Sequence, residues 1–221
     1  NQLNISIPVN KVIGIVGPSG SGKSTLVDIL LGLIEIKKGC LKIDGTIIDR
    51  ANRRLWQNTI GFVAQAIFLS EGTIAENIAF GIPNNQIDHK KVKKALKLAN
   101  LEEFVQALKL GVDTKVGERG VQLSGGQRQR IGIARALYNE AEVLFFDEAT
   151  SSLDGITEKM IMEAVNEFSG KKTIVMIAHR LKTVEKCDQI FFIDEGKVAD
   201  QCTFDELIER NEKFRNMANH A

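Results

Sequence analysis

The chain has few cysteines, no long apolar run and no signal peptide, and each of these shortages excludes a class of protein. Its three cysteines, Cys40, Cys187 and Cys202, stand apart from one another and show no Cys-x-x-Cys spacing. We therefore expect no disulfide scaffold and no cysteine-based metal or redox site, and the isolated thiols are typical of a reducing compartment. No apolar stretch approaches the ~18 residues that cross a bilayer as a helix.

An excess of charge of one sign is also missing, since 29 basic and 28 acidic residues leave a net charge of +1. This balance gives no electrostatic case for a nucleic-acid or membrane surface. The most basic segment, 88–98, carries five lysines, but its apolar residues fall on one helical face and no aromatic residues stand between the lysines. We interpret it as a helix with a solvated basic face and expect no nucleic-acid partner.

What the chain does contain is enough apolar sequence for one well-packed domain. Its 221 residues, 43% of them hydrophobic, suit a single domain with a subdomain. The first residue is Asn1 rather than Met, and residues 3–7 alternate like a strand already under way. We therefore expect this domain to belong to a longer polypeptide.

The chain is organised around a glycine-rich segment that fits the phosphate-binding loop pattern: Gly, any four residues, Gly, Lys, then Ser or Thr. An apolar strand over 12–16 precedes it and a helix follows it, which is the context that the motif needs. Its residues are Gly17, Pro18, Ser19, Gly20, Ser21, Gly22, Lys23, Ser24 and Thr25. The pattern predicts binding of a nucleoside triphosphate, but it does not separate a kinase, a GTPase, a helicase or a transporter motor.

Each residue type in this loop has a physical reason to be there. Gly20 and Gly22 let the backbone curl so that successive N–H groups face phosphate oxygens, and the start of the next helix adds a positive field. Lys23 places a positive charge on the β- and γ-phosphates, and Ser24 offers its hydroxyl to Mg²⁺. The alternative, an ordinary glycine-rich turn, leaves the Lys-Ser-Thr sequence unexplained.

Two acidic residues, Asp147 and Glu148, follow the fully apolar strand 143–146. Ligand groups in parallel sheets gather beyond the carboxyl ends of the strands. Beside a phosphate loop, Asp147 can hold Mg²⁺ directly or through water, and Glu148 can polarise the water that attacks the γ-phosphate. A solvated acidic turn is the alternative, and the apolar strand that precedes the pair speaks against it.

Gln65 and His179 each follow another apolar strand, over 60–64 and 173–178 respectively. By the same reasoning, Gln65 reaches Mg²⁺ or the attacking water, and His179 donates a hydrogen bond that senses the γ-phosphate. Taken alone, an ordinary loop glutamine and a structural histidine would be the simpler interpretations. Their shared position at strand ends favours the functional one.

A second glycine-rich turn opens another predicted helix, which continues to residue 137. Ser124 and Gln127 have the spacing of a capping box, and the two glycines between them leave the backbone open to close approach. The turn can therefore be an anion site, although a plain helix cap without a ligand explains the local pattern equally well. Its residues are Leu123, Ser124, Gly125, Gly126 and Gln127.

Taken together, these motifs resemble the nucleotide-binding domain of ATP-binding-cassette (ABC) transporters over essentially the whole chain. They stand in the order of that family: phosphate loop, glutamine loop at Gln65, signature at 123–127, the acidic pair at a strand end, and a switch histidine at His179. Ser151 and Asp154 lie in a stretch similar to the family's loop at the dimer seam. A signature turn that accompanies a phosphate loop is highly specific for the family.

The resemblance implies an α/β fold: a P-loop core with a mixed, mainly parallel sheet, an antiparallel β subdomain and a helical signature subdomain. It implies a core lobe at about 1–68 and 141–221 and a helical lobe at about 69–140. It further implies a head-to-tail dimer, a homodimer or paired cassette, that closes on two ATP and Mg²⁺. In this dimer Lys23, Ser24, Gln65, Asp147, Glu148 and His179 of one subunit face Ser124 and Gly126 of the other.

Residues 116–120 resemble the loop with which exporters contact their membrane domains, and 67–80 and 118–138 are similar to bacterial lipid and lipid-linked oligosaccharide flippases. The expected partner is thus a transmembrane domain, at the cytoplasmic face of a bacterial inner membrane. The chain departs from the family in having no adenine-stacking aromatic within 1–16 and Ala64 where proline is common. The missing aromatic predicts weaker ATP binding, since stacking of a base is worth ~1–3 kcal/mol in nucleic-acid proteins.

Two other functions use parts of the same pattern. A soluble cassette ATPase of DNA repair would insert a long coiled coil between loop and signature, for which about 100 residues leave no room, and translation types usually carry two cassettes. A metabolic P-loop kinase would phosphorylate a small acceptor and would lack the signature. The sequence therefore favours the ATPase motor of an exporter, and its cargo cannot be deduced from this domain.

Overall fold

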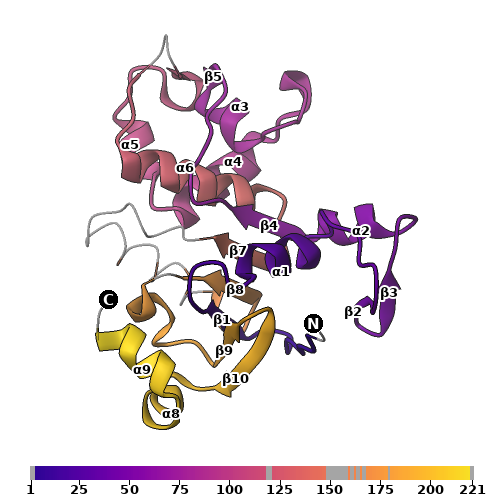
Figure 1. The fold of residues 1–221 in the computed structure, drawn as a ribbon. Coiled ribbons are helices and arrows are strands. Elements are labelled where there is room, and N and C mark those ends of the chain that lie inside the picture. The colour runs from indigo at the N-terminus through magenta and orange to yellow at the C-terminus, as the bar shows by residue number, and fades with distance from the viewer. Residues whose placement is uncertain are drawn as a thin grey trace.

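The computed structural model describes residues 3–117, 121–147, 159, 162, 165, 168–178 and 180–219. Its centre is a six-stranded sheet in the order β10-β9-β1-β8-β7-β4 (Figure 1). The pairs from β9 to β4 are parallel, and β10 pairs with β9 antiparallel through the 195–196 turn. The strands are β1 (Val12–Val16), β4 (Ile60–Val63), β7 (Val143–Asp147), β8 (Thr173–Ile177), β9 (Gln189–Asp194) and β10 (Lys197–Cys202).

The central strands are continuous apolar runs because both faces of the sheet are buried. Alternate residues of each strand enter different cores, as the two-residue period of a strand requires. In β7, for example, Leu144 and Phe146 join the larger core, whereas Phe145 joins the smaller one on the opposite face. Both cores are closed by helices.

The smaller core is covered by α1 (Lys23–Leu30) and by Trp56 of α2 (Arg53–Asn58). A separate antiparallel hairpin, β2 (Leu41–Ile43) and β3 (Thr46–Ile48), lies beside α2 (Figure 1). Its Asp44-Gly45 turn has positive φ at both positions, as a tight hairpin requires.

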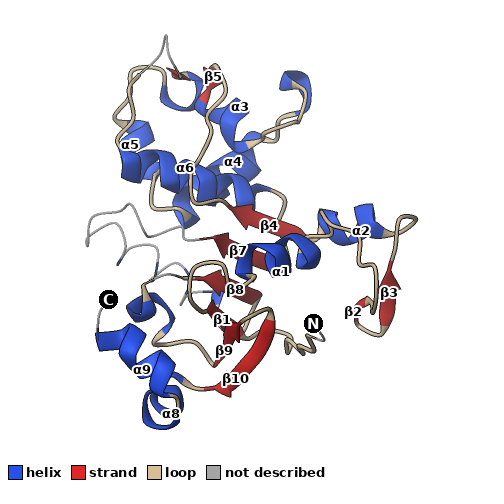
Figure 2. Cartoon of the chain, in the orientation of Figure 1, coloured by secondary structure: helices blue, strands red, loops and turns tan. Residues whose placement is uncertain are grey.

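The larger core contains residues of the remaining helices. These are α3 (Ile74–Ile78), α4 (His89–Leu98), α5 (Glu102–Gln106), α6 (Gly125–Tyr138), α8 (Phe204–Arg210) and α9 (Glu212–Asn219) (Figure 2). Short elements connect them: β5 (Gly72–Thr73), β6 (Lys115–Val116) and the 3₁₀ turns η1 (Asn84–Gln86), η2 (Gly111–Asp113) and η3 (Leu181–Val184). None of the helices within the described residues is long and apolar enough to cross a membrane.

The α/β class and the mixed, mainly parallel sheet expected from the sequence are confirmed, but two local predictions are wrong. Residues 3–7 form no strand; Leu3, Ile5 and Ile7 pack against the smaller core through their side chains alone. Residues 204–219 form two helices rather than one, since Asn211 is extended and its Oδ1 accepts the N–H of Phe214. An asparagine side chain that caps a new helix start competes with continuation of the old one.

The three cysteines differ sharply in access, which predicts an order of alkylation. Burial, aided by the neighbouring Asp188 charge, raises the pKa of Cys187 to about 12, whereas Cys40 is exposed. Since the thiolate is the reactive form, iodoacetamide at pH 8 should label Cys40 in the folded chain and Cys187 only after denaturation. Peptide mass spectrometry over time would measure this order, and labelling of both thiols at one rate would contradict the burial.

Candidate functional site

The phosphate-loop residues lie between the end of β1 and the start of α1. The loop bends sharply at its start, where an added Cβ on Gly17 would be 2.0 Å from the backbone oxygen of Ile193. Because that oxygen belongs to β9 in the sheet, only glycine fits here. Gly20 and Gly22 have φ of 77° and 101°, the left-handed conformation that glycine adopts at low cost.

Lys23 is held inside this loop. Its side chain is 5% exposed, and its Nζ donates to the backbone oxygens of Gly17 and Pro18 at 2.8 and 2.9 Å. The chain therefore wraps around an ammonium group at the first residue of α1. A buried positive charge of this kind attracts an anion that approaches the loop.

Two further features show that the loop fits a phosphate group. Gly22 at the helix start provides no side-chain cap, so the first N–H groups of α1 are not satisfied by that residue. The Ser21 hydroxyl is buried and has no hydrogen-bond partner in the described part of the chain. Uncapped helix donors, an enclosed cation and an orphaned hydroxyl together form a site for a negatively charged ligand.

The sheet brings two of the predicted polar residues to the same edge as the loop. Register pairs Ile15 of β1 with Ile177 of β8, and Ile177 with Asp147 of β7, so Asp147 lies level with the last residues of β1. Val63 of β4 pairs with Phe146, which places Gln65 just beyond the same edge. The hypothesis that these groups share one edge of the sheet therefore agrees with the strand register.

The predicted Mg²⁺ ligands have suitable chemistry, because a hydroxyl, a carboxylate and an amide oxygen are all hard donors. Ser24 is exposed at the start of α1 and Asp147 is half-exposed at the end of β7. Over the described ranges there is no group of three or more His, Cys, Asp or Glu side chains that could hold a metal ion. Mg²⁺ at this edge would thus take its other ligands from phosphate oxygens and water, as it usually does.

Four predicted residues, Glu148, Ser151, Asp154 and His179, lie outside the described residues. So does part of the 116–120 segment, of which Val116 and Gly117 are described. The roles assigned to these residues stay predictions.

The signature turn opens α6, as its spacing predicts. The Ser124 hydroxyl accepts the N–H of Gln127 at 3.2 Å, and the Gln127 Oε1 accepts the N–H of Ser124 at 2.8 Å. Ser124 and Gly125 are exposed, whereas Leu123 is buried and anchors the turn. A capped, exposed helix start with two small residues can approach an anion closely.

This turn is separated from the phosphate loop of its own chain. Helix α6 runs opposite to β4: an added Cβ on Gly61 would meet the Ala136 oxygen, while Gln129 bonds Ala64 at the carboxyl end of the strand. The helix start thus lies beyond the edge on the β4 side. Since β4 is three strands from β1, about 14 Å at ordinary strand spacing, the chain carries two distinct candidate anion sites.

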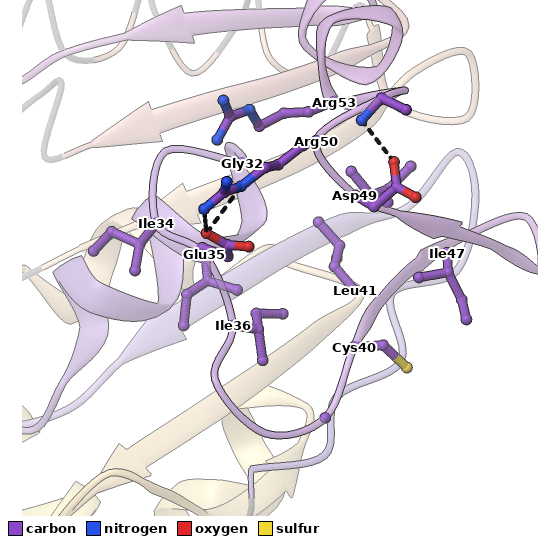
Figure 3. Close-up of a pocket in the computed structure, with 14 residues that line it drawn as sticks. Gly32, Ile34, Glu35, Ile36, Cys40, Leu41, Ile47, Asp49, Arg50 and Arg53 are labelled. Carbon is purple, nitrogen blue, oxygen red and sulfur yellow. Dashed lines mark hydrogen bonds and ion pairs between the residues drawn. The ribbon is translucent and has the colours of Figure 1, made fainter.

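A cavity of about 470 Å³ lies elsewhere, behind the carboxyl end of α1 (Figure 3). Its walls are the hairpin β2–β3 and the segments before and after it, and no phosphate-loop residue lines it. Arg50 and Glu35 form an ion pair at one side, and the other labelled side chains are mostly apolar (Figure 3). Both partners of this pair are highly exposed, so it adds little to stability.

Sequence reasoning missed the residues that hold the site's helices from behind. The Trp56 Nε1 donates to the Leu30 oxygen at 2.7 Å and the Gln57 Nε2 to the oxygens of Leu31 and Gly32, which satisfies the last carbonyls of α1. A lone Trp in a polar segment was the available signal. A second set, around Arg135, is described below.

Known proteins match this chain along nearly its whole length. The sequence pattern of the ABC transporter family matches residues 1–151. The chain is 41% identical over 210 residues to an ATP-dependent lipid A-core flippase of Cupriavidus pinatubonensis, covering 95% of this chain and 36% of that protein. It is 40% identical over 220 residues to the mitochondrial ATP-binding cassette sub-family B member 10 of Mus musculus, covering 99% and 31%.

A solved structure agrees with these relatives. A bacterial Atm1-family ABC exporter with ATP bound superposes with a TM-score of 0.90 at 36% identity, over 99% of this chain and 38% of that chain. The chain thus spans about a third of the length of the proteins that it matches.

Proposed function

The chain belongs to the ABC transporter family as an ATP-binding domain of the exporter type, and from this we propose that it is the ATP-hydrolysing motor of a membrane exporter. Two chains would close head to tail on two ATP molecules. The observation that carries this proposal is the separation of the two anion sites, which one chain cannot bring to a single nucleotide. A second copy, turned end to end, supplies the missing half of each site.

In this proposal the residues of the phosphate loop bind ATP in the open chain. The first N–H groups of α1 and the Lys23 ammonium hold the β- and γ-phosphates. Ser24, Asp147 and Gln65 would hold Mg²⁺, which neutralises charge on the phosphate oxygens. The Ser124 hydroxyl and the Gly126 N–H of the second chain then bind the γ-phosphate from its other side.

Glu148 would orient the attacking water and accept its proton, and His179 would hydrogen-bond the γ-phosphate. Loss of that phosphate removes contacts on both sides of the interface, so the dimer opens. Closure is therefore driven by interactions present in one state and absent in the other, which is what a nucleotide switch requires. Ser151 and Asp154 would lie at the seam between the chains.

Coupling to transport is the less direct part of the proposal. We propose that the core lobe (about 1–68 and 141–221) and the helical lobe (about 69–140) move relative to each other, and that a transmembrane domain of the same transporter, contacted partly through 116–120, follows this movement. The flippase names among the relatives support a lipid-like cargo. The domain would then work at the cytoplasmic face of a bacterial inner membrane.

Phosphate release tests the enzymatic part. With Mg²⁺ and ATP alone, the chain should release inorganic phosphate with a sigmoidal dependence on ATP concentration, and removal of Mg²⁺ by EDTA should abolish the release. Release that requires a small-molecule acceptor would instead indicate a P-loop kinase. Phosphate release that is hyperbolic and independent of protein concentration would contradict the shared site.

A further inference from the structure

One face of α6 is fastened to the segment that carries the glutamine loop. Residues 64–70 leave the end of β4 and pass along this helix. At the start of the segment, the buried Gln129 side chain donates its Nε2 to the Ala64 oxygen at 3.3 Å. This bond holds the residue directly before Gln65.

The second contact is a close approach of backbone to side chain. Gly132 lies three residues after Gln129, on the same helical face. An added Cβ on Gly132 would be 2.3 Å from Ile67 Cδ1 and 2.7 Å from Ile67 Cγ1. Glycine at this position lets Ile67 rest against the helix backbone.

The third contact is Arg135, again three residues further along. Its Nε donates to the Asn77 oxygen at 2.8 Å and its Nη2 to the Phe68 oxygen at 3.0 Å. Its guanidinium carbon lies 4.6 Å from the centre of the Phe80 ring. One half-buried arginine therefore joins α6 to the 64–70 segment and to α3.

Asn77 completes the attachment from within α3. It is fully buried, its Oδ1 accepts the N–H of Ser70 at 3.0 Å, and its Nδ2 donates to the oxygens of Ser70 and Thr73 at 3.0 Å. A buried amide with its donors and acceptor satisfied by backbone fixes that backbone firmly. The far end of the segment is thus held as well as its start.

These contacts occupy one helix whose first turn is the signature. A helix transmits displacement as a stiff rod, and α6 has 14 residues, about 21 Å. Any shift of the 64–70 segment must therefore move the Ser124 turn, unless the contacts at Gln129, Gly132 and Arg135 break. Resting on the proposed function, this has a consequence for the dimer, because Gln65 serves a chain's own nucleotide and Ser124 serves the nucleotide of its partner.

We propose that Gln129, Arg135 and Asn77 are positioning residues that fasten α6 to residues 64–70 and thereby couple the two nucleotide sites of the dimer. Occupation of one site, felt at Gln65, sets the position of the signature turn in the other. Cooperativity in ATP then depends on this attachment, while binding of ATP to a single open chain does not.

Arg135→Lys tests the attachment, since lysine keeps the positive charge but cannot reach both carbonyls as the planar guanidinium does. Arg215→Lys is the matched control: the Arg215 Nε donates to the Ile208 oxygen and its Nη2 to the Glu209 oxygen, far from the site. Dimer formation against ATP concentration would be measured by light scattering, and ATP affinity by calorimetry at a protein concentration where the chain is monomeric. Thermal unfolding would be recorded for each variant.

We expect Arg135→Lys to lower the Hill coefficient toward one and to raise the ATP concentration for half-maximal dimer by at least about fivefold, within the usual range of coupling between sites. Monomer affinity should change by less than about twofold in both variants, and the control should keep wild-type cooperativity. Unchanged cooperativity in Arg135→Lys, or an equal loss of monomer affinity, would overturn the proposal. An unmodified chain that binds ATP but never dimerises would instead refute the proposed function itself.

A second pair of variants covers the case in which Arg135→Lys unfolds. Gly132→Ala should impair cooperativity, because its methyl displaces Ile67. Adding Ile67→Ala removes the displaced atoms and should restore the Hill coefficient at least in part. A double variant as impaired as Gly132→Ala, or a Gly132→Ala variant with normal cooperativity, would show that this contact does not link the sites.

Discussion

Replacing Glu148 with glutamine is expected to slow steady-state ATP hydrolysis by at least about 100-fold, the usual contribution of a positioned general base. ATP binding should stay within about twofold, since glutamine keeps the shape and hydrogen-bonding reach of the side chain and loses only the ability to take a proton. Glu148 follows Asp147 at the end of β7, on the edge where β1 ends in the phosphate loop. Phosphate release and calorimetric ATP binding measure the two quantities.

The matched control for this variant is Glu142→Gln, an exposed glutamate just before the same strand. It should hydrolyse ATP at the wild-type rate. If Glu148→Gln hydrolyses ATP undiminished, Glu148 is not the carboxylate that activates water, and Asp147 becomes the residue to change next.

Replacing Lys23 with alanine should act on the other step, binding. A charged hydrogen bond is worth about 1.5–3 kcal/mol, so the loss predicts roughly 10- to 150-fold weaker ATP binding. The geometry supports a dedicated role, because the Lys23 ammonium is enclosed by the Gly17 and Pro18 carbonyls and is positioned by the first turn of α1. Isothermal calorimetry with ATP and with ADP measures the effect.

Lys42→Ala, which removes an exposed lysine of β2, is the control and should bind ATP as the unmodified chain does. Thermal unfolding without nucleotide separates a lost ligand contact from a damaged fold. Wild-type affinity in a folded Lys23→Ala variant would show that the loop does not bind the phosphates as proposed.

The parts of the fold that could be predicted from sequence are those with a local cause. Glycines with positive φ and a lysine at a helix start define the phosphate loop within nine residues, and the capping box at Ser124 and Gln127 defines the start of α6. Fully apolar strands predicted burial on both faces, and strand ends predicted the edge that Gln65 and Asp147 share.

The parts that could not be predicted depend on distant residues. Arg135 meets Phe68 and Asn77, 67 and 58 positions away along the chain, and no pattern in a single sequence records such pairs. Alternation over 3–7 predicted a strand, yet a strand also needs a backbone partner, which side-chain periodicity does not provide. In 204–219 the helical period continues through Asn211, and only the bond from Phe214 shows that this asparagine starts a new helix.

The most direct test of the shared-site mechanism is the solution mass of the Glu148→Gln chain by light scattering, at nucleotide concentrations that calorimetry shows to be saturating. The mechanism predicts twice the monomer mass with Mg²⁺ and ATP, the monomer mass with Mg²⁺ and ADP, and loss of the dimer when Ser124→Arg is added. A chain saturated with ATP that stays monomeric, or a dimer that forms equally with ADP or with Ser124→Arg, would contradict it.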